Sequence, residues 1–459
     1  MKAWKTLVFI FSIIAVLAGI SSVFPQDGLK VSPSVTFHFP SITDIAGEDP
    51  AVTAAARAED ERLAAERLAW ENDYAAFFNS APSRFFLPGD DLTFFDDLFE
   101  AFEDAGRKRM RIVHYGDSQI EMDRMSDVIR DSLQGRFGGM GPGLVPFKDS
   151  YYTRTICSVT SGAFSRYACF GLDSAQRASH GRYGPRFEMA RSFGDVHSSF
   201  YPNKTNTLRS RRFNTLTVVS RNESGRLTLR CSGRVQEQES GTDTRFTRFE
   251  LPEETERARL DVSGDAELYG VMLDGRTGVC LDNIGMRGCS GTVFAGVSSR
   301  QLKDYFTGEN VRLIIFQFGG NAMPAINSDR AASLYARSLV RHLEALKSMA
   351  PSARIVFVGP SDMATMHNGR LQTYPKLPAL VDSLKTVSAE CGAAYWDFYS
   401  AMGGSGSIIA WNKARPQLAA SDYVHLTNRG VDEIGKMFYQ SLMKYYDYYL
   451  WRKRNGAGL

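Results

Sequence analysis

Residues 111–133, "RIVHYGDSQIEMDRMSDVIRDSL", place a serine between a run that favours a β-strand and a run that favours a helix. Ile112, Val113 and Tyr115 are β-prone, whereas the apolar residues after Ser118 recur at helical spacing. We therefore expect Ser118 at a strand-to-helix turn. A serine there often only caps the helix. The same turn also suits a nucleophile, because the N–H groups of a helix N-terminus stabilise a nearby oxyanion.

The C-terminal part of the chain continues this alternation of strands and helices. "VRLIIFQFGGN" (311–321), "ARIVFVGP" (353–360) and "AAYWDFY" (393–399) are apolar runs typical of buried strands. Amphipathic helices are expected at 330–350, 377–392 and 430–450. This order predicts an α/β fold with a parallel sheet between two helical layers. Ligands bind such sheets at the carboxyl ends of the strands, where Ser118 and Asn321 are expected.

"SDYVHLTNRG" (421–430) carries an aspartate and a histidine just before the closing helix. Because Asp422 and His425 are three positions apart in a turn, the Asp422 carboxylate can reach one nitrogen of His425 and leave the other facing the cleft. This arrangement fixes the tautomer that a serine needs in its general base. The alternative is that Asp422 or Thr427 caps the closing helix and His425 is an ordinary surface residue.

Composition limits the remaining functions. The chain has 459 residues, 43% of them hydrophobic, and a net charge of +3, so it holds a large core and shows no basic excess for nucleic-acid binding. None of the six cysteines forms a C-x-x-C pair, which argues against a zinc site. In an oxidising compartment Cys157 and Cys169 are candidates for a disulfide. The alternative is that the cysteines act as small buried apolar residues.

The N-terminus indicates export. Residues 6–24 form a 19-residue stretch without charge, preceded by Lys2 and Lys5. This length can span a bilayer, and the basic flank is expected to stay in the cytoplasm. We favour an uncleaved anchor over a cleaved signal, because no clear small-residue cleavage site follows. Residues 26–50 then have the composition of a linker.

Four motifs, taken together and in order, resemble those of the SGNH hydrolases, also called GDSL esterases and lipases. Gly116-Asp117-Ser118 resembles the nucleophile motif, and "NIGMRG" with Gly288 resembles the oxyanion-glycine motif. "GGN" with Asn321 and "DYVH" with Asp422 and His425 resemble the other two motifs. Gln119 departs from the pattern, since it stands where the GDSL name has leucine, and this argues against the lipid-hydrolysing members.

The resemblance covers residues 88–150 and 275–450, and the gap between them predicts an insertion. The segment 151–274 consists of short alternating runs separated by turn residues, which we interpret as an antiparallel β-sandwich. An insertion at this point is similar to that of the bacterial peptidoglycan O-acetylesterases, in which a sandwich resembling a carbohydrate-binding module interrupts the hydrolase. The sandwich is therefore expected to bind glycan, and the alternative is a structural lid or a protein-binding module.

The resemblance implies a domain order and a set of roles. The expected parts are a membrane anchor or signal (1–25), a linker and helix (26–87), a flavodoxin-like SGNH hydrolase domain in two pieces (88–150 and 275–459) and the insertion (151–274). Ser118, His425 and Asp422 would act as nucleophile, base and orienting acid. The N–H groups of Ser118 and Gly288 and the Asn321 amide would form the oxyanion hole, and no metal or organic cofactor is implied.

The implied activity is a serine esterase that removes O-acetyl groups from a cell-envelope glycan, most simply peptidoglycan. Two alternatives use the same residues: an O-acetyltransferase that passes the acyl group to a sugar hydroxyl, and an esterase acting on another acetylated polysaccharide. A non-enzymatic alternative is an anchored glycan-binding protein with a decayed hydrolase domain. The expected location is the periplasmic face of the inner membrane, or the periplasm if the signal is cleaved.

Overall fold

The computed structural model describes residues 3–25, 27–32, 35–41, 50–148, 152–171, 174–206 and 208–455. The chain divides into two compact units, Met1–Ala76 and Phe77–Leu459, which are described separately. The expected basic residue Lys2 and the linker residues 26, 33–34 and 42–49 lie outside the described residues.

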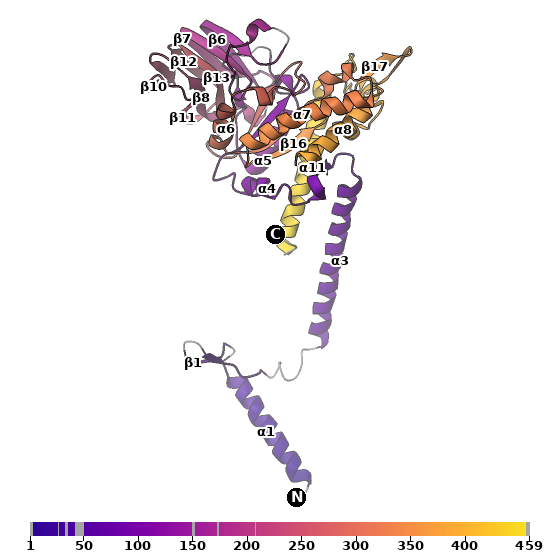
Figure 1. Cartoon of the computed structure of the whole chain (residues 1–459). Coiled ribbons are helices and arrows are strands. Elements are labelled where there is room, and N and C mark those ends of the chain that lie inside the picture. Colours follow the sequence, from indigo (N-terminus) through magenta and orange to yellow (C-terminus); the bar gives the residue numbers. More distant parts are fainter. Residues whose placement is uncertain are drawn as a thin grey trace. The chain divides into compact units, whose positions relative to one another are not determined.

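The N-terminal unit contains helix α1, a short hairpin and most of a long helix, α3 (Figure 1). Within α1, Trp4–Val23 is long and apolar enough to cross a membrane, and none of it is buried among the described residues. A signal sequence has the same properties, so anchor and signal remain alternatives. The bounds are α1 Ala3–Val23, β1 Leu29–Ser32, β2 Val35–Phe37 and α3 Pro50–Ser80.

A six-stranded sheet forms the centre of the second unit, in the order β14-β4-β15-β16-β19-β3. The first five strands are parallel, as predicted, and the two-residue edge strand β3 is antiparallel. Side chains alternate between the two faces of β4, so that Ile112 and Val113 enter different hydrophobic clusters. The bounds are β3 Phe85–Phe86, β4 Met110–Gly116, β14 Val279–Gly285, β15 Val311–Gln317, β16 Arg354–Val358 and β19 Ala394–Trp396.

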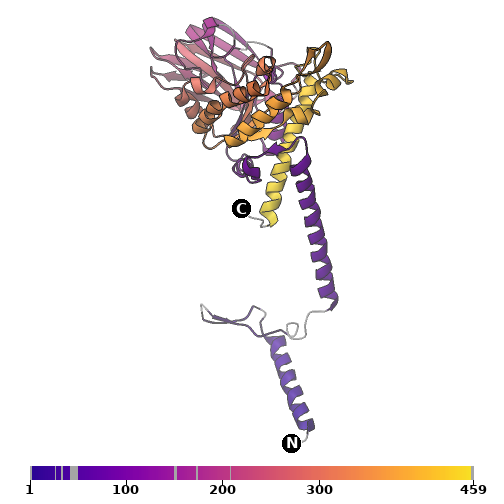
Figure 2. The ribbon, with the colours of Figure 1, turned by 45° about the vertical axis from the view of Figure 1, so that its right-hand side comes forward.

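Helices cover both faces of this central sheet, which gives the predicted three layers (Figures 1 and 2). Helices α6, α7 and α8 contribute to the cluster on one face, and α4, α5, α9, α10 and α11 contribute to the cluster on the other. The bounds are α4 Asp96–Glu103, α5 Ser126–Phe137, α6 Ser299–Gly308, α7 Asp329–Met349, α8 Leu377–Glu390, α9 Phe398–Met402, α10 Ser407–Lys413 and α11 Asn428–Asn455. The 3-10 helices are η1 Pro88–Asp90, η2 Glu121–Asp123, η3 Ser174–Gln176, η4 Arg209–Arg211, η5 Phe294–Gly296 and η6 Gly320–Ala325.

The inserted segment forms antiparallel β-structure, as predicted, but its eight strands join β5, from the preceding hydrolase piece, in one nine-stranded sheet. The path β10-β9-β12-β7-β13-β8-β11 is extended by β6 on β7 and by β5 on β13, and the sheet encloses a hydrophobic cluster of its own. A small hairpin, β17–β18, lies elsewhere in the unit. The bounds are β5 Gly143–Val145, β6 Ile156–Ala168, β7 Glu188–Pro202, β8 Phe213–Arg221, β9 Leu227–Cys231, β10 Arg234–Gln238, β11 Arg245–Thr255, β12 Ala258–Ser263, β13 Ala266–Asp274, β17 Ala364–His367 and β18 Arg370–Thr373.

The inserted sheet shares a hydrophobic core with the central sheet. Phe187 and Tyr269 of the insertion belong to the same cluster as Tyr115 of β4, and the Tyr115 hydroxyl donates to the Pro185 carbonyl at 3.0 Å. Tyr115 and Phe187 also make an edge-to-face contact, with ring centroids 5.4 Å apart. The insertion is therefore packed into the hydrolase and is not tethered beside it.

Of the two alternatives for Cys157 and Cys169, the structure does not support the disulfide. Cys157 lies at the start of the 13-residue strand β6 and Cys169 directly follows its end, and the structure contains no disulfide between them. At about 3.3 Å of rise per residue, that separation is several times the Cα distance that a disulfide spans.

Candidate active site

Ser118, His425 and Asp422 form a continuous hydrogen-bonded chain. The distance from Ser118 Oγ to His425 Nε2 is 2.9 Å, and the distance from His425 Nδ1 to Asp422 Oδ2 is 2.8 Å. The second carboxylate oxygen of Asp422 accepts the backbone N–H groups of Val424 and His425, each at 3.0 Å. The structure thus brings together the three residues that were predicted to cooperate, although 307 positions separate the serine from the histidine.

The surroundings of Asp422 keep its carboxylate ionised. Partial burial raises the pKa of Asp422, but the hydrogen bonds from His425 and Val424 outweigh it and leave the pKa below its ordinary value. An ionised Asp422 accepts the Nδ1–H of His425, so that Nε2 is free to accept the serine proton. The side chain of His425 is 33% exposed, which leaves room for a substrate beside the serine.

His114 is the other histidine near the nucleophile, and it is unsuitable as a base. Its ring is fully buried and hydrogen-bonded to Gln317 and Ser126, and burial lowers its pKa to about 4. The imidazole is therefore neutral at physiological pH, and both nitrogens already have partners.

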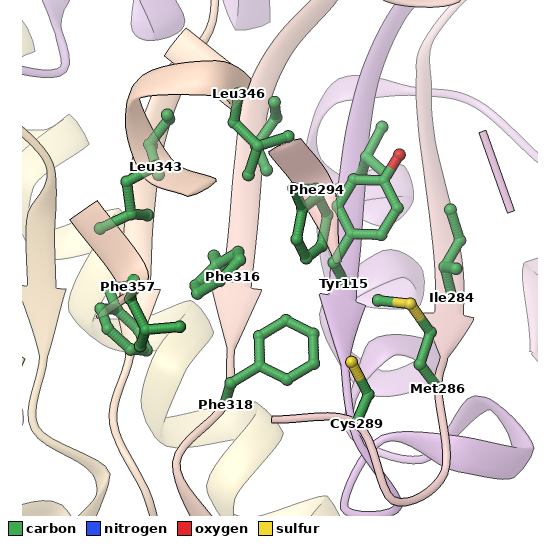
Figure 3. Close-up of a cluster of buried hydrophobic side chains, with 14 of the residues drawn as sticks. Tyr115, Ile284, Met286, Cys289, Phe294, Phe316, Phe318, Leu343, Leu346 and Phe357 are labelled. Carbon is green, nitrogen blue, oxygen red and sulfur yellow. The ribbon is translucent and has the colours of Figure 1, made fainter. Parts of the chain in front are cut away.

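Gly288 is exposed on a loop, whereas two nearby residues of the same loop are buried. Met286 and Cys289 are 0% and 5% exposed and point into the aromatic cluster beneath the loop (Figure 3). Gly288 has φ +75°, and a Cβ atom built there would meet no atom within 4 Å. The glycine is thus required by its left-handed backbone and not by crowding. The open space above it permits the close approach of a substrate.

Asn321, on η6, forms hydrogen bonds to both the turn that carries Ser118 and the loop that carries Gly288. Its Nδ2 donates to Asp117 Oδ2 at 3.0 Å and to the Cys289 carbonyl at 3.1 Å. The amide therefore lies beside the two other expected oxyanion donors. Because both of its hydrogens already have acceptors, donation to an oxyanion requires one of these bonds to lengthen or to be shared.

Asp117 has a role that the sequence analysis did not assign. Besides holding Asn321, its Oδ1 accepts the N–H of Gln119 at 2.9 Å and so closes the nucleophile turn. Burial raises the pKa of Asp117 to about 6, although these bonds and the nearby His425 act in the opposite direction. The carboxyl is consequently sensitive to pH close to the physiological range.

The helix after the serine begins later than predicted. Helix α5 starts at Ser126, and before it Met122, Asp123 and Met125 have positive φ angles between 62° and 68°. Left-handed conformations in residues other than glycine interrupt a helix and cost about 1–3 kcal/mol each. The expectation that Ser118 adjoins a helix N-terminus was therefore wrong, and the dipole of α5 does not act directly on the serine.

Contacts from helix α5 and from the segment that leads into β6 hold this strained segment. Arg130 makes a two-pronged ion pair with Asp123, with both N–O distances 2.8 Å, and Thr155 donates to the same carboxylate. The Arg154 N–H donates to the Met122 carbonyl at 3.0 Å. Since Arg154 and Thr155 belong to the segment that leads into β6, the insertion helps to shape the turn after the nucleophile.

Glu121 and Arg287 form an ion pair that links the nucleophile segment to the Gly288 loop. Both Glu121 oxygens lie 2.9 Å from Arg287 Nε, and Glu121 is 3% exposed whereas Arg287 is 67% exposed. Sequence reasoning missed both residues because nothing in the motifs marks them. Among the described residues, no group of three or more His, Cys, Asp or Glu side chains is arranged to hold a metal ion.

Comparison with known proteins finds one family model that matches part of the chain. Residues 262–432 match the model of the GDSL-like Lipase/Acylhydrolase family. This range contains Gly288, Asn321, Asp422 and His425, but it starts within the last part of the insertion and so leaves out Ser118. The match indicates a GDSL-type acylhydrolase domain in this part of the chain and supports a carboxylic ester hydrolase. A search of curated proteins found no match.

Solved structures support the fold. A peptidoglycan O-acetylesterase is similar with a TM-score of 0.64 at 16% identity, over 78% of this chain and 97% of that one. A family two carbohydrate esterase from Cellvibrio japonicus has a TM-score of 0.25 at 11% identity, over 64% of this chain and 99% of that one. Only the first score indicates a shared fold.

Proposed function

We propose that the chain is a serine O-acetylesterase acting on a cell-envelope glycan, with peptidoglycan as the preferred substrate. The observation that carries this proposal is the Ser118–His425–Asp422 chain, with distances of 2.9 and 2.8 Å, beside the Asn321 amide and the exposed Gly288. The fold shared with a peptidoglycan O-acetylesterase and the N-terminal apolar helix support a substrate outside the cytoplasm.

The proposed reaction has two halves. Ser118 Oγ attacks the acetyl carbonyl while His425 Nε2 takes its proton, and the same histidine then protonates the departing sugar oxygen. The N–H groups of Ser118 and Gly288, with the Asn321 amide, stabilise the oxyanion. Water, deprotonated by His425, then releases acetate from the acyl-enzyme. Asp422 stays ionised throughout and stabilises the imidazolium.

Acetate release from O-acetylated peptidoglycan by the purified full-length protein tests the proposal. Peptidoglycan freed of O-acetyl groups by mild base is the substrate control, and Ser118→Ala is the enzyme control. We expect the variant to lose about 10⁶-fold in turnover, as other catalytic triads do. Its free energy of unfolding should change by no more than about 1.5 kcal/mol, the typical net worth of one hydrogen bond.

Other results of this assay would point to a different nucleophile, reaction or substrate. Activity retained by a folded Ser118→Ala variant would refute the nucleophile assignment. Transfer of acetyl to an added sugar acceptor, with little free acetate, would favour the O-acetyltransferase. Release from another acetylated polysaccharide but not from peptidoglycan would keep the esterase and change its substrate.

A further inference from the structure

Three successive carbonyl groups of the loop that carries His425 are held by hydrogen bonds. The Val424 carbonyl accepts from Gln119 Nε2 at 2.8 Å, and the His425 carbonyl accepts from the Ala420 N–H at 2.8 Å. The Leu426 carbonyl accepts from Arg124 Nη1 at 3.2 Å. Two of the three donors, those on either side of His425, therefore come from the segment that carries Ser118.

Arg124 connects the two halves of the site directly. A second guanidinium nitrogen, Nη2, donates to the carbonyl of Ser118 at 2.7 Å, while Nη1 holds Leu426. Because the guanidinium is planar and rigid, it fixes the separation between the main chain at the serine and the main chain next to the histidine. A lysine at this position would keep the charge and lose the fixed geometry.

The hydrogen bonding of Gln119 does not indicate that this side chain stabilises the fold. Its Oε1 is buried and has no hydrogen-bond partner among the described residues, whereas Nε2 reaches Val424. An unpaired buried carbonyl costs about 1–3 kcal/mol, so an apolar residue would suit the packing better. Leucine, which stands at this position in the GDSL name, has no donor for Val424.

We propose that Gln119 and Arg124 are positioning residues that set the distance between Ser118 and His425; together they are called the histidine clamp below. The proposal rests on the proposed function, in which these two residues are nucleophile and base. The loop needs such a clamp because packing fixes it weakly: Asp422 is 50% exposed, and Tyr423 has a strained φ of 55°. A displacement of about 1 Å in a catalytic pair costs about 100-fold in rate.

Gln119→Leu and Arg124→Lys test the clamp, with a chromogenic acetyl ester as substrate. We expect kcat to fall about 10- to 100-fold and KM to stay within about twofold, because a positioning effect acts on the transition state. Gln417→Leu is the matched control. Gln417 also donates to a carbonyl of this loop, that of Ala419 at 2.8 Å, but not beside the histidine, and Asn412 holds the same carbonyl. The control should keep kcat within about twofold.

A second background separates positioning from general damage to the site. In His425→Ala there is no histidine left to position, so adding Gln119→Leu should change the residual rate by less than about twofold. A further loss of about 10-fold or more in that background would overturn the proposal. An unchanged kcat in the folded single variants would also overturn it. If Ser118→Ala and His425→Ala both keep wild-type activity, the proposed function fails instead, which is a distinct result.

Discussion

Asp117→Asn should change how the stability of the protein depends on pH. The pKa of this buried carboxyl is raised to about 6 from its ordinary value of 3.8, mainly by burial. The folded protein therefore keeps the proton up to about pH 6, whereas the unfolded chain releases it near pH 3.8. Between these values the folded state binds more protons, so the contribution of Asp117 to the free energy of unfolding falls as the pH rises.

The size of this effect follows from the pKa difference. About two pH units correspond to about 3 kcal/mol, present below pH 4 and lost above pH 6. Asparagine does not titrate, so the variant should gain about 3 kcal/mol relative to the wild type between pH 4 and pH 7. It also offers one acceptor where Asp117 offers two, to Gln119 and Asn321. This loss should cost about 1 kcal/mol at every pH.

Urea unfolding of both proteins at several pH values measures this difference. Fluorescence is a suitable probe, because Trp396 is fully buried in the central sheet and reports on its unfolding. Other titrating groups, such as His114, affect both proteins equally and cancel in the subtraction. A wild-type-to-variant difference that is the same at pH 4 and pH 7 would refute the reasoning, because it would mean that Asp117 is ionised in the folded protein at both values.

The remaining predictions concern the oxyanion groups and the N-terminus. Asn321→Ala should lower turnover on a small acetyl ester about 100- to 1,000-fold if the amide binds the oxyanion; an effect on KM alone would assign it to ground-state binding. Gly288→Ala should cost about 1–2 kcal/mol of stability through its positive φ and lower kcat by displacing the N–H, which thermal unfolding and steady-state kinetics measure. The full-length protein should fractionate with membranes and resist extraction by high salt, and a soluble form starting near residue 25 would instead show a cleaved signal.

Periodicity and turn chemistry were sufficient to predict most of the central sheet. Strands such as "VRLIIFQ" are apolar on both faces because helices cover both sides, and that pattern is visible locally. The inserted β-structure was also predictable from its alternation. Its single-sheet pairing was not, because β5 pairs with β13 across more than a hundred residues of sequence. Nothing local encodes such a register.

The predicted site residues come together, but most of the groups that hold them in place could not be predicted from the sequence. Recognisable motifs contain Ser118, His425 and Asp422. No motif marks Arg124, whose hydrogen bond to the Leu426 carbonyl is seen only in the folded structure. The strained turn at Met122 was missed because its residues are good helix formers, and tertiary contacts override that preference. Gln119 did carry a signal, since it differed from the motif, but its partner could be found only in three dimensions.

The separation of Ser118 and His425 in the sequence also determines when the site assembles. During synthesis the serine emerges first, then the inserted β-structure, and the histidine only 307 positions after the serine. Contacts between such distant positions form late, because a long loop must first be closed. A polypeptide that ends before residue 422 would hold the proposed nucleophile and oxyanion groups without the proposed base. The three side chains can therefore meet only after synthesis has passed residue 425.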